Sequence, residues 1–192
     1  MPGSSLWLLP PKSHPLNDTL VTLIEQTSSR FGSLNRFIPH ITITSEISPS
    51  LYAKSPQKWL DSLQLPEGNH VKVKFERLAS EDVYVRKLYI KCTKTKELEE
   101  LAGICRQQVE GQDEEKAITW ATDTYNPHLS LLYHDCPPVD ANALAATAES
   151  VEKAGLKLAG EGDFAGWVGG RIILVPTDKS IEEWAPIAEK TF

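Results

Sequence analysis

The chain has 192 residues, 41% of them hydrophobic, so it is long enough to bury a core and lies within the size range of one domain. Its formal net charge of −6 disfavours long nucleic acid as a tight partner, because affinity for a phosphate backbone comes mainly from clustered Lys and Arg. The charge does not exclude a small phosphate ester as the ligand. Three cysteines without a Cys-x-x-Cys pair argue against a disulfide framework and favour a reducing compartment.

The N-terminal segment predicts a buried strand and a helix without a targeting signal. The apolar run at residues 6–9 ends at paired prolines, which cannot continue a ladder, and it is far too short for a signal peptide or a membrane span. We therefore expect a cytoplasmic or nuclear protein with no membrane attachment. A helix follows, capped by Asn17 or Asp18 and ended by Gly32, with apolar residues at helical spacing.

The middle of the chain favours strands. Residues 40–47 predict a strand that the Ser-Pro-Ser segment at 48–50 ends, and a short helix is expected around Trp59. Apolar and charged residues then alternate at 71–76, as in a half-exposed strand, and residues 86–93 supply the expected hairpin partner.

The second half predicts the same mixture of elements. We expect a helix around 98–105, a solvated acidic loop at 111–115, a strand at 128–133, a helix at 140–154, closing strands at 164–168 and 171–175, and a terminal helix at 181–189. Gly169-Gly170 suits a tight turn, so the closing strands are expected to form a hairpin. No linker divides the chain, which indicates one α+β domain of two similar lobes.

Two segments of the chain share one pattern of residue classes. Residues 37–43 read Phe-Ile-Pro-His-Ile-Thr-Ile, and residues 125–131 read Tyr-Asn-Pro-His-Leu-Ser-Leu. Alternate residues of a strand face the same way, so each copy places one imidazole and one hydroxyl on one face and its aliphatic residues on the other. A repeat of so many residue classes is improbable by chance.

The chemistry of the shared side chains points to a phosphate site. Imidazole transfers protons near neutral pH and a hydroxyl binds an anion, which makes His40 and His128 candidate proton carriers and Thr42 and Ser130 candidate phosphate ligands. A zinc site would need a third ligand, often a carboxylate, and neither segment has an acidic residue at alternate spacing. Ser130 as a nucleophile would lack the Gly-x-Ser-x-Gly elbow.

The two segments resemble the twin His-x-Thr/Ser signature of the 2H phosphoesterase superfamily, and most of all its fungal and plant 2′,3′-cyclic nucleotide phosphodiesterases. Weaker parts of the resemblance lie at Leu6 to Pro10, in the extension 128–133, and at Thr177 to Lys179 with Trp184, so that it covers essentially the whole chain. The plant members use disulfides near the site. Three widely spaced cysteines do not reproduce that feature, so the closer kinship is with the fungal members.

The resemblance implies a particular α+β architecture. The expected fold is a single bilobal domain over residues 1–192, of the LigT-like type, in which two antiparallel sheets face each other across a central cleft with helices on their outer faces. Each lobe would present one His-x-Thr/Ser strand toward a near two-fold axis, and the substrate phosphate would sit between the strands.

The resemblance also implies an activity, namely the metal-independent hydrolysis of 2′,3′-cyclic phosphates to 2′-phosphates without a cofactor. It makes His128 the base and His40 the acid, with Thr42 and Ser130 on the non-bridging phosphate oxygens. Tyr133 matches a family tyrosine that assists at the phosphate. Simple alternation places Tyr133 opposite Ser130, so its involvement requires a twist or bulge at the strand end.

The expected partner is a small cyclic-phosphate nucleotide bound by a monomer. The resemblance suggests ADP-ribose 1″,2″-cyclic phosphate, a by-product of tRNA splicing, which would be converted to ADP-ribose 1″-phosphate. Two alternatives stay open: an RNA-end-processing member of the superfamily, which a positively charged stripe beside the cleft would favour, and a binding module without chemistry. Arg36, Arg86 and Arg171 are candidate cations by charge alone, and Trp7 either stacks on a nucleobase or belongs to the core.

Overall fold

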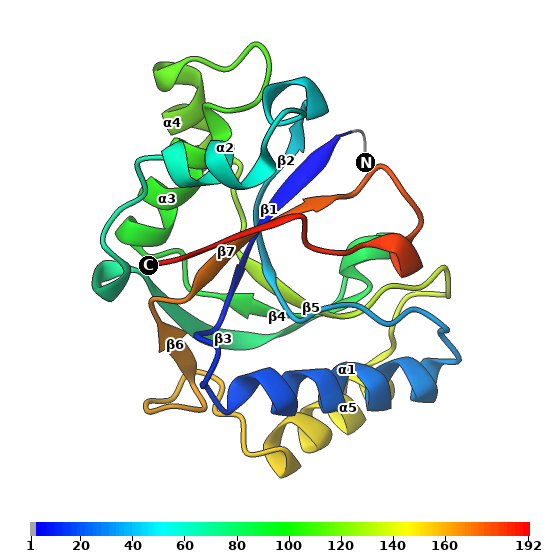
Figure 1. Ribbon diagram of the computed structural model, residues 1–192. Helices are drawn as coiled ribbons and strands as arrows, with labels where there is room; N and C mark the ends of the chain where they lie inside the picture. Colours follow the sequence, from blue (N-terminus) through cyan, green and yellow to red (C-terminus); the bar gives the residue numbers. More distant parts are fainter. Residues whose placement is uncertain (1–2) are drawn as a thin grey trace.

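A computed structural model describes residues 3–192 as a curled antiparallel sheet with helices packed against it (Figure 1). The strands are β1 (Ser4–Leu9), β2 (Ile41–Ile47), β3 (Lys72–Ala79), β4 (Leu88–Cys92), β5 (His128–Leu132), β6 (Gly166–Val168), β7 (Arg171–Pro176) and β8 (Ala188–Thr191). The helices are α1 (Leu16–Phe31), α2 (Pro56–Ser62), α3 (Lys96–Arg106), α4 (Glu114–Asp123) and α5 (Ala141–Lys153). No helix among the described residues is long and apolar enough to cross a membrane.

The strand order places the two motif strands in the centre of the sheet. The order is β6-β3-β4-β5-β2-β1-β7-β8, and each pair of neighbouring strands is antiparallel. β5 and β2 meet at the pair Ile41 and Leu129, with three further strands on either side. The expected α+β class with antiparallel strands is confirmed. The strands form one continuous sheet and not two separate sheets, because the motif strands hydrogen-bond to each other.

Local sequence signals explain most element boundaries. Gly32 ends α1 in the left-handed conformation (φ 71°), as predicted, and the side chain of Asp140 caps α5. The expected cap of α1 is wrong, since the helix begins after Pro15 without a side-chain cap. Asn17 instead donates its amide to the carbonyl oxygen of Pro11 at 2.7 Å, which closes the turn that leads into the helix.

The acidic segment at 111–115 is only partly the loop that we expected. Asp113 accepts a hydrogen bond from the backbone of Lys116 and caps α4, which begins at Glu114. Acidic residues in a first helical turn are stabilised by the helix dipole, so the same charges that suggested a solvated loop favour a helix start.

The C-terminal pairing differs from the prediction in two respects. β6 pairs with β3, and β7 pairs with β1 and β8, so Gly169-Gly170 joins two strands that do not form a hairpin. A side chain at Gly170 (φ 126°) would lie 2.2 Å from the carbonyl oxygen of Leu9, so only glycine fits this crossing. The terminal helix is replaced by a short turn at Ile181–Glu183 and by β8, because Pro186 interrupts a helix and the edge of β7 offers a partner.

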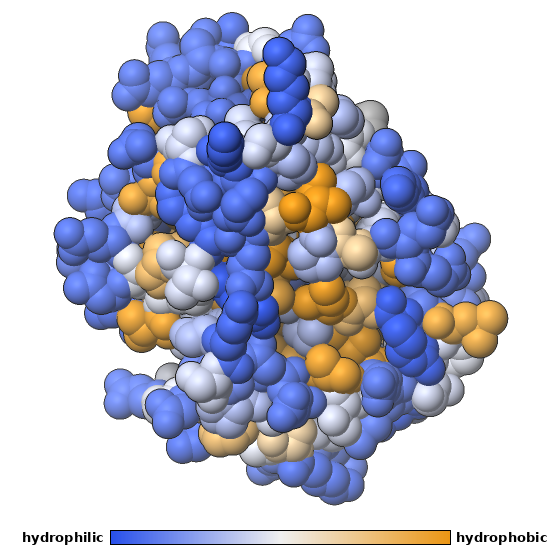
Figure 2. All heavy atoms as spheres, viewed as in Figure 1, coloured by the Kyte–Doolittle hydropathy of each residue, from blue (hydrophilic) through white to orange (hydrophobic). Residues whose placement is uncertain are grey.

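The two faces of the sheet have different neighbours. The helices pack against one face: α1 and α5 lie together at one end, and α2, α3 and α4 at the other (Figure 1). Leu6 and Leu8 of β1 belong to the large core beneath these helices, whereas Trp7 and Leu9 project to the opposite face and form a small cluster with Ile173. We call this opposite face the site face. In the space-filling view, apolar side chains gather in the middle with hydrophilic residues around them (Figure 2).

Candidate active site

The pairing of β2 with β5 brings the two motifs together on the site face. Ile41 and Leu129 are register partners and lie in the core, so their neighbours in each strand project to the site face. Continued antiparallel pairing sets Ser130 across from His40 and His128 across from Thr42. The two histidines are close enough that the charge of His128 contributes to lowering the pKa of His40.

Each imidazole is held in the same way by its own backbone. Nδ1 of His40 lies 2.5 Å from the carbonyl oxygen of Ile38, and Nδ1 of His128 lies 2.8 Å from that of Asn126. A carbonyl oxygen only accepts hydrogen bonds, so Nδ1 must carry the proton and Nε2 of the neutral ring is free to accept one. Both contacts cross a Pro-His step, and the proline keeps the residue before it extended.

The side chain of His40 is surrounded by neutral aromatic groups. It is 4% exposed, and its ring is stacked on the indole of Trp7 with 3.6 Å between the centroids and 7° between the planes. Phe37 approaches edge-on, and the hydroxyl of Tyr133 lies 3.5 Å from Nε2. Burial lowers the pKa of His40 to about 3. The imidazole is therefore neutral in the free protein near pH 7.

His128 has charged neighbours. Its ring is half-buried and meets the ring of Tyr89 edge to face, with centroids 5.2 Å apart. The hydroxyl of Tyr89 donates to Glu81 at 2.6 Å, and Glu81 is ion-paired with Arg86 at 2.9 Å. Burial lowers the pKa of His128 and nearby Arg86 lowers it further, whereas Glu81 raises it. The two halves of the site are thus alike in backbone geometry and different in electrostatics.

The two motif hydroxyls are both on the site face but have different partners. Ser130 is buried and donates its hydroxyl to the carbonyl oxygen of Val85 at 2.9 Å. Thr42 is half-buried in register with Trp7 of β1. A phosphate oxygen at Ser130 would have to replace Val85 as the acceptor.

Tyr133 reaches His40 although strand alternation predicts the opposite. β5 ends at Leu132, so Tyr133 lies beyond the last residue to which alternation applies. Its ring stacks on Phe37 with 3.9 Å between centroids, which directs the hydroxyl to Nε2 of His40. Burial raises the pKa of Tyr133, while its contact with the Ser130 hydroxyl lowers it. The tyrosine is therefore a neutral hydrogen-bond donor.

Several side chains that line this site were not predicted as site residues, although Trp184 belongs to the weaker part of the family resemblance. Tyr89 is the register partner of Ser130, and Trp184 meets both Trp7 and Tyr133 edge-on. Only Phe37 belongs to a motif, and its counterpart Tyr125 is buried against Trp120 in the core instead. The position of Tyr89 follows from alternation once the pairing of β4 with β5 is known.

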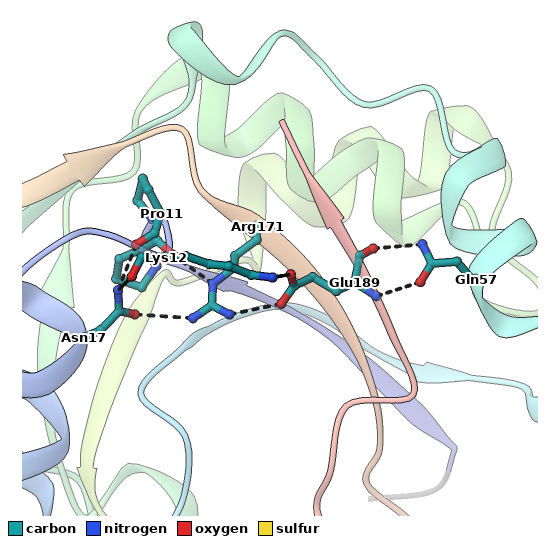
Figure 3. Close-up of polar contacts among 7 residues, drawn as sticks. Pro11, Lys12, Asn17, Gln57, Arg171 and Glu189 are labelled. Atoms are coloured by element: carbon teal, nitrogen blue, oxygen red, sulfur yellow. Dashed lines mark hydrogen bonds and ion pairs between the residues drawn. The ribbon is translucent and has the colours of Figure 1, made fainter.

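The three candidate arginines have different positions. Arg171 binds Glu189, the carbonyl oxygen of Pro10 and the side chain of Asn17 (Figure 3), which makes it a structural tie between β7, β8 and the start of α1. Arg36 binds the carbonyl oxygens of Ser33 and Asn35 just after α1. Of the three, Arg86 is the one whose charge acts on His128. In the described part of the chain, no three His, Cys, Asp or Glu side chains cluster as metal ligands would.

Comparison with known proteins shows similarity to one family along the whole chain. The family described as "Cyclic phosphodiesterase-like protein" matches residues 1–192. A 2′,3′-cyclic-nucleotide 3′-phosphodiesterase of Phaeosphaeria nodorum is 62% identical over 191 residues, and one of Neurospora crassa is 41% identical over 211 residues; in both cases 99% of each chain is covered. The crystal structure of E. coli LigT complexed with 3′-AMP superposes with a TM-score of 0.51 at 11% identity, covering 100% of this chain and 99% of that one, and shows the fold alone.

Proposed function

Because the chain belongs to the cyclic phosphodiesterase-like protein family, we propose that it is an enzyme that hydrolyses the 2′,3′-cyclic phosphate of a nucleotide and leaves a 2′-phosphate. The membership confirms the family resemblance read from the twin motif. The observation that carries the proposal is the pair of imidazoles, His40 and His128. Two adjacent antiparallel strands present both rings on one face, and each ring has Nδ1 bound to its own backbone and Nε2 available.

The proposed reaction needs a proton acceptor and a proton donor on opposite sides of phosphorus. A water oxygen attacks phosphorus while the bond from phosphorus to the ribose 3′ oxygen breaks in line with it. One imidazole takes a proton from the water, and the other gives a proton to the departing 3′ oxygen. We assign His128 as the base and His40 as the acid, as the family resemblance implies, with both rings acting through Nε2.

Substrate binding supplies the protonation state that this mechanism requires. Burial keeps both imidazoles neutral in the free protein, since desolvation lowers the pKa of each. A bound cyclic phosphate carries a negative charge, and an opposite charge nearby raises the pKa of an imidazole. The electron-rich face of the Trp7 indole also attracts a positively charged imidazolium. Because Trp7 stacks on His40, this attraction favours protonation of His40 when the substrate is bound.

The hydroxyl groups are proposed to hold the phosphate oxygens. Thr42 and Ser130 would each donate to a non-bridging oxygen, where negative charge increases in the transition state. Tyr133, whose hydroxyl lies beside His40 and Ser130, would be a third donor. The scheme uses no metal ion and no cofactor, and the two halves of the sheet, β6-β3-β4-β5 and β2-β1-β7-β8, act as its two lobes.

The proposed substrates are small soluble nucleotides. ADP-ribose 1″,2″-cyclic phosphate from tRNA splicing is the physiological substrate that the family resemblance suggests, and a monomer in the cytoplasm would suffice to process it. A protein with a net charge of −6 has little general attraction for long nucleic acid, which is consistent with a small substrate.

Phosphorus NMR of the purified protein with 2′,3′-cyclic AMP tests the function. We expect sustained conversion to the 2′-phosphate, and we expect the His40→Ala and His128→Ala variants to be inactive controls. Saturable binding of the cyclic nucleotide without any product would contradict the proposed enzymatic activity and would indicate a binding module without chemistry. Accumulation of the 3′-phosphate would overturn the proposed bond cleavage.

A further inference from the structure

Basic side chains gather on the half of the site face that adjoins His128. Lys91 of β4 is the register partner of His128, and Arg77 of β3 is the register partner of Lys91. Register partners in antiparallel strands project to the same face, so these two cations extend outward from His128. With about 4.8 Å between neighbouring strands, Arg77 lies about 10 Å from the strand of His128.

The same row continues along β3. Val73 and Phe75 belong to the core, so Lys72 and Lys74 project to the site face by alternation. Both lysines are exposed and border a hollow that Glu161 and Asp163 also line; within residues 3–192 neither ammonium group makes a hydrogen bond or ion pair. The row thus holds four basic side chains in a protein whose net charge is negative.

One carboxylate forms ion pairs with both of the cations nearest to His128. Glu76 lies 3.3 Å from Nζ of Lys91 and 3.6 Å from Nε of Arg77. Both cations remain open to solvent, with side chains 31% and 60% exposed. Exposed ion pairs of this kind are weak, so a phosphate can compete with Glu76 for both partners.

The other half of the site face has no comparable row. Trp7, Leu9, Ile173 and Val175 form the apolar cluster there. Arg171 lies at its outer end and is occupied by Glu189, which also pairs with Lys12 at 2.6 Å. Arg86, on the His128 side, is already paired with Glu81. The continuous row of exposed basic side chains beside the histidines therefore lies on the β3–β4 side, whereas Arg36 next to the first motif donates to neutral oxygens.

We propose that Lys91 and Arg77, with Lys74 beyond them, form a subsite for a second phosphate group of the substrate, separate from the cyclic phosphate between the histidines. The inference rests on the proposed function and adds a preference to it: the enzyme favours cyclic-phosphate nucleotides that carry a further phosphate, either in a diphosphate or in a phosphodiester. The apolar half of the face then meets the uncharged part of the substrate.

Substrates that differ only in the further phosphate test the subsite. We compare kcat/KM for 2′,3′-cyclic AMP, for the same compound with a 5′-diphosphate, and for an adenosine dinucleotide that ends in a 2′,3′-cyclic phosphate. We expect about a tenfold preference for at least one of the two phosphate-bearing compounds. Preference for the diphosphate indicates a small nucleotide as the natural source, and preference for the dinucleotide indicates an RNA end.

Variants of the row locate the effect. Arg77→Gln and Lys91→Gln should each reduce the preference by about threefold to tenfold, whereas Glu76→Gln should increase it, because it frees both cations. The matched control is Lys153→Gln, which removes one exposed positive charge from α5 on the helix-covered side. It should leave the preference unchanged. If these residues served only to stabilise the fold, each variant would lower kcat/KM for all three substrates by the same factor.

The outcomes separate the subsite from the function on which it rests. If the protein hydrolyses 2′,3′-cyclic AMP but shows no preference, or if Arg77→Gln, Lys91→Gln and Glu76→Gln leave the preference unchanged, the subsite is overturned and the activity stands. If no cyclic phosphate is hydrolysed, the proposed function fails first.

Discussion

The indole of Trp7 lies flat against the imidazole of His40, with 3.6 Å between the ring centroids and 7° between the planes. Trp7 is 1% exposed, so its face is not available to a nucleobase and belongs to the histidine instead. Within residues 3–192, no carboxylate makes a hydrogen bond or ion pair with His40. Among the described residues, the carbonyl oxygen of Ile38, which accepts from Nδ1, and the π-face of Trp7 are therefore the groups that stabilise a positive charge on this ring.

Replacing Trp7 should alter the protonation of His40. Trp7→Leu keeps an apolar side chain but removes the π-face, so we expect kcat to fall about fivefold to tenfold and the alkaline limb of its pH profile to move to lower pH. Trp7→Phe should restore most of the rate. NMR titration of the His40 ring measures the same shift directly. Ile173→Val, in the same apolar cluster, controls for packing; if Trp7→Leu and Ile173→Val behave alike, Trp7 has only a packing role.

The two histidines should act as a unit. Either single change to Ala should reduce kcat by about a thousandfold, and the double variant should be little worse than a single one. The rate of the unmodified protein should rise and fall with pH, since one ring must start neutral and the other protonated. EDTA should leave it unchanged. Loss of activity in EDTA that zinc or manganese restores would contradict the metal-free scheme.

The motif hydroxyls should affect rate more than fold. Thr42→Val and Ser130→Ala each remove a phosphate donor and leave both imidazoles, so we expect kcat/KM to fall about tenfold to a thousandfold. Thr42→Ser keeps the hydroxyl and should retain most of the activity. Steady-state kinetics together with thermal unfolding separates the two effects. Folded variants with unchanged kinetics would remove these groups from phosphate binding.

Glu81 should tune His128 from outside the motif. Its charge raises the pKa of His128, so Glu81→Gln should lower that pKa and move the acidic limb of the pH profile to lower pH. Tyr89→Phe keeps the carboxylate and removes only its hydrogen bond, which makes it the matched control. If the acidic limb lies at the same pH in both variants and in the unmodified protein, the titration of His128 does not cause this limb.

Stability should decrease in mild acid because of the buried imidazoles. Both histidines have a folded pKa below the unfolded value of about 6.5, and that of His40 is about 3. The unfolded chain therefore binds more protons below pH 6.5, and the free energy of unfolding should fall as pH drops. Well below pH 6.5, His40 should contribute about 1.4 kcal/mol per pH unit, and His128 should add a decrease of the same sign. Urea titrations between pH 7.5 and 4.5 measure the slope. His40→Gln should flatten it, and an equal slope in that variant would assign the effect elsewhere.

The sequence alone determined the local chemistry. The repeated Pro-His-x-Thr/Ser pattern places an imidazole and a hydroxyl on one side of a strand, because side chains alternate along an extended chain wherever the strand lies in the sheet. The same reasoning identified β3 and β4 as a hairpin and Gly32 as the end of α1. The family resemblance rested on this local pattern too.

Only the tertiary structure decided which strands pair and what surrounds the histidines. A residue pattern indicates which face of a strand a side chain occupies, but it does not indicate which strand will be the neighbour. For this reason the expected hairpin of β6 and β7 is wrong. The segment that forms β8 was likewise expected to be a helix. Alternation also fails at Tyr133, because the strand ends one residue earlier and stacking on Phe37 directs the ring. The contacts of Trp7 with His40 and of Lys91 with His128 depend on register between distant segments, which long-range packing sets.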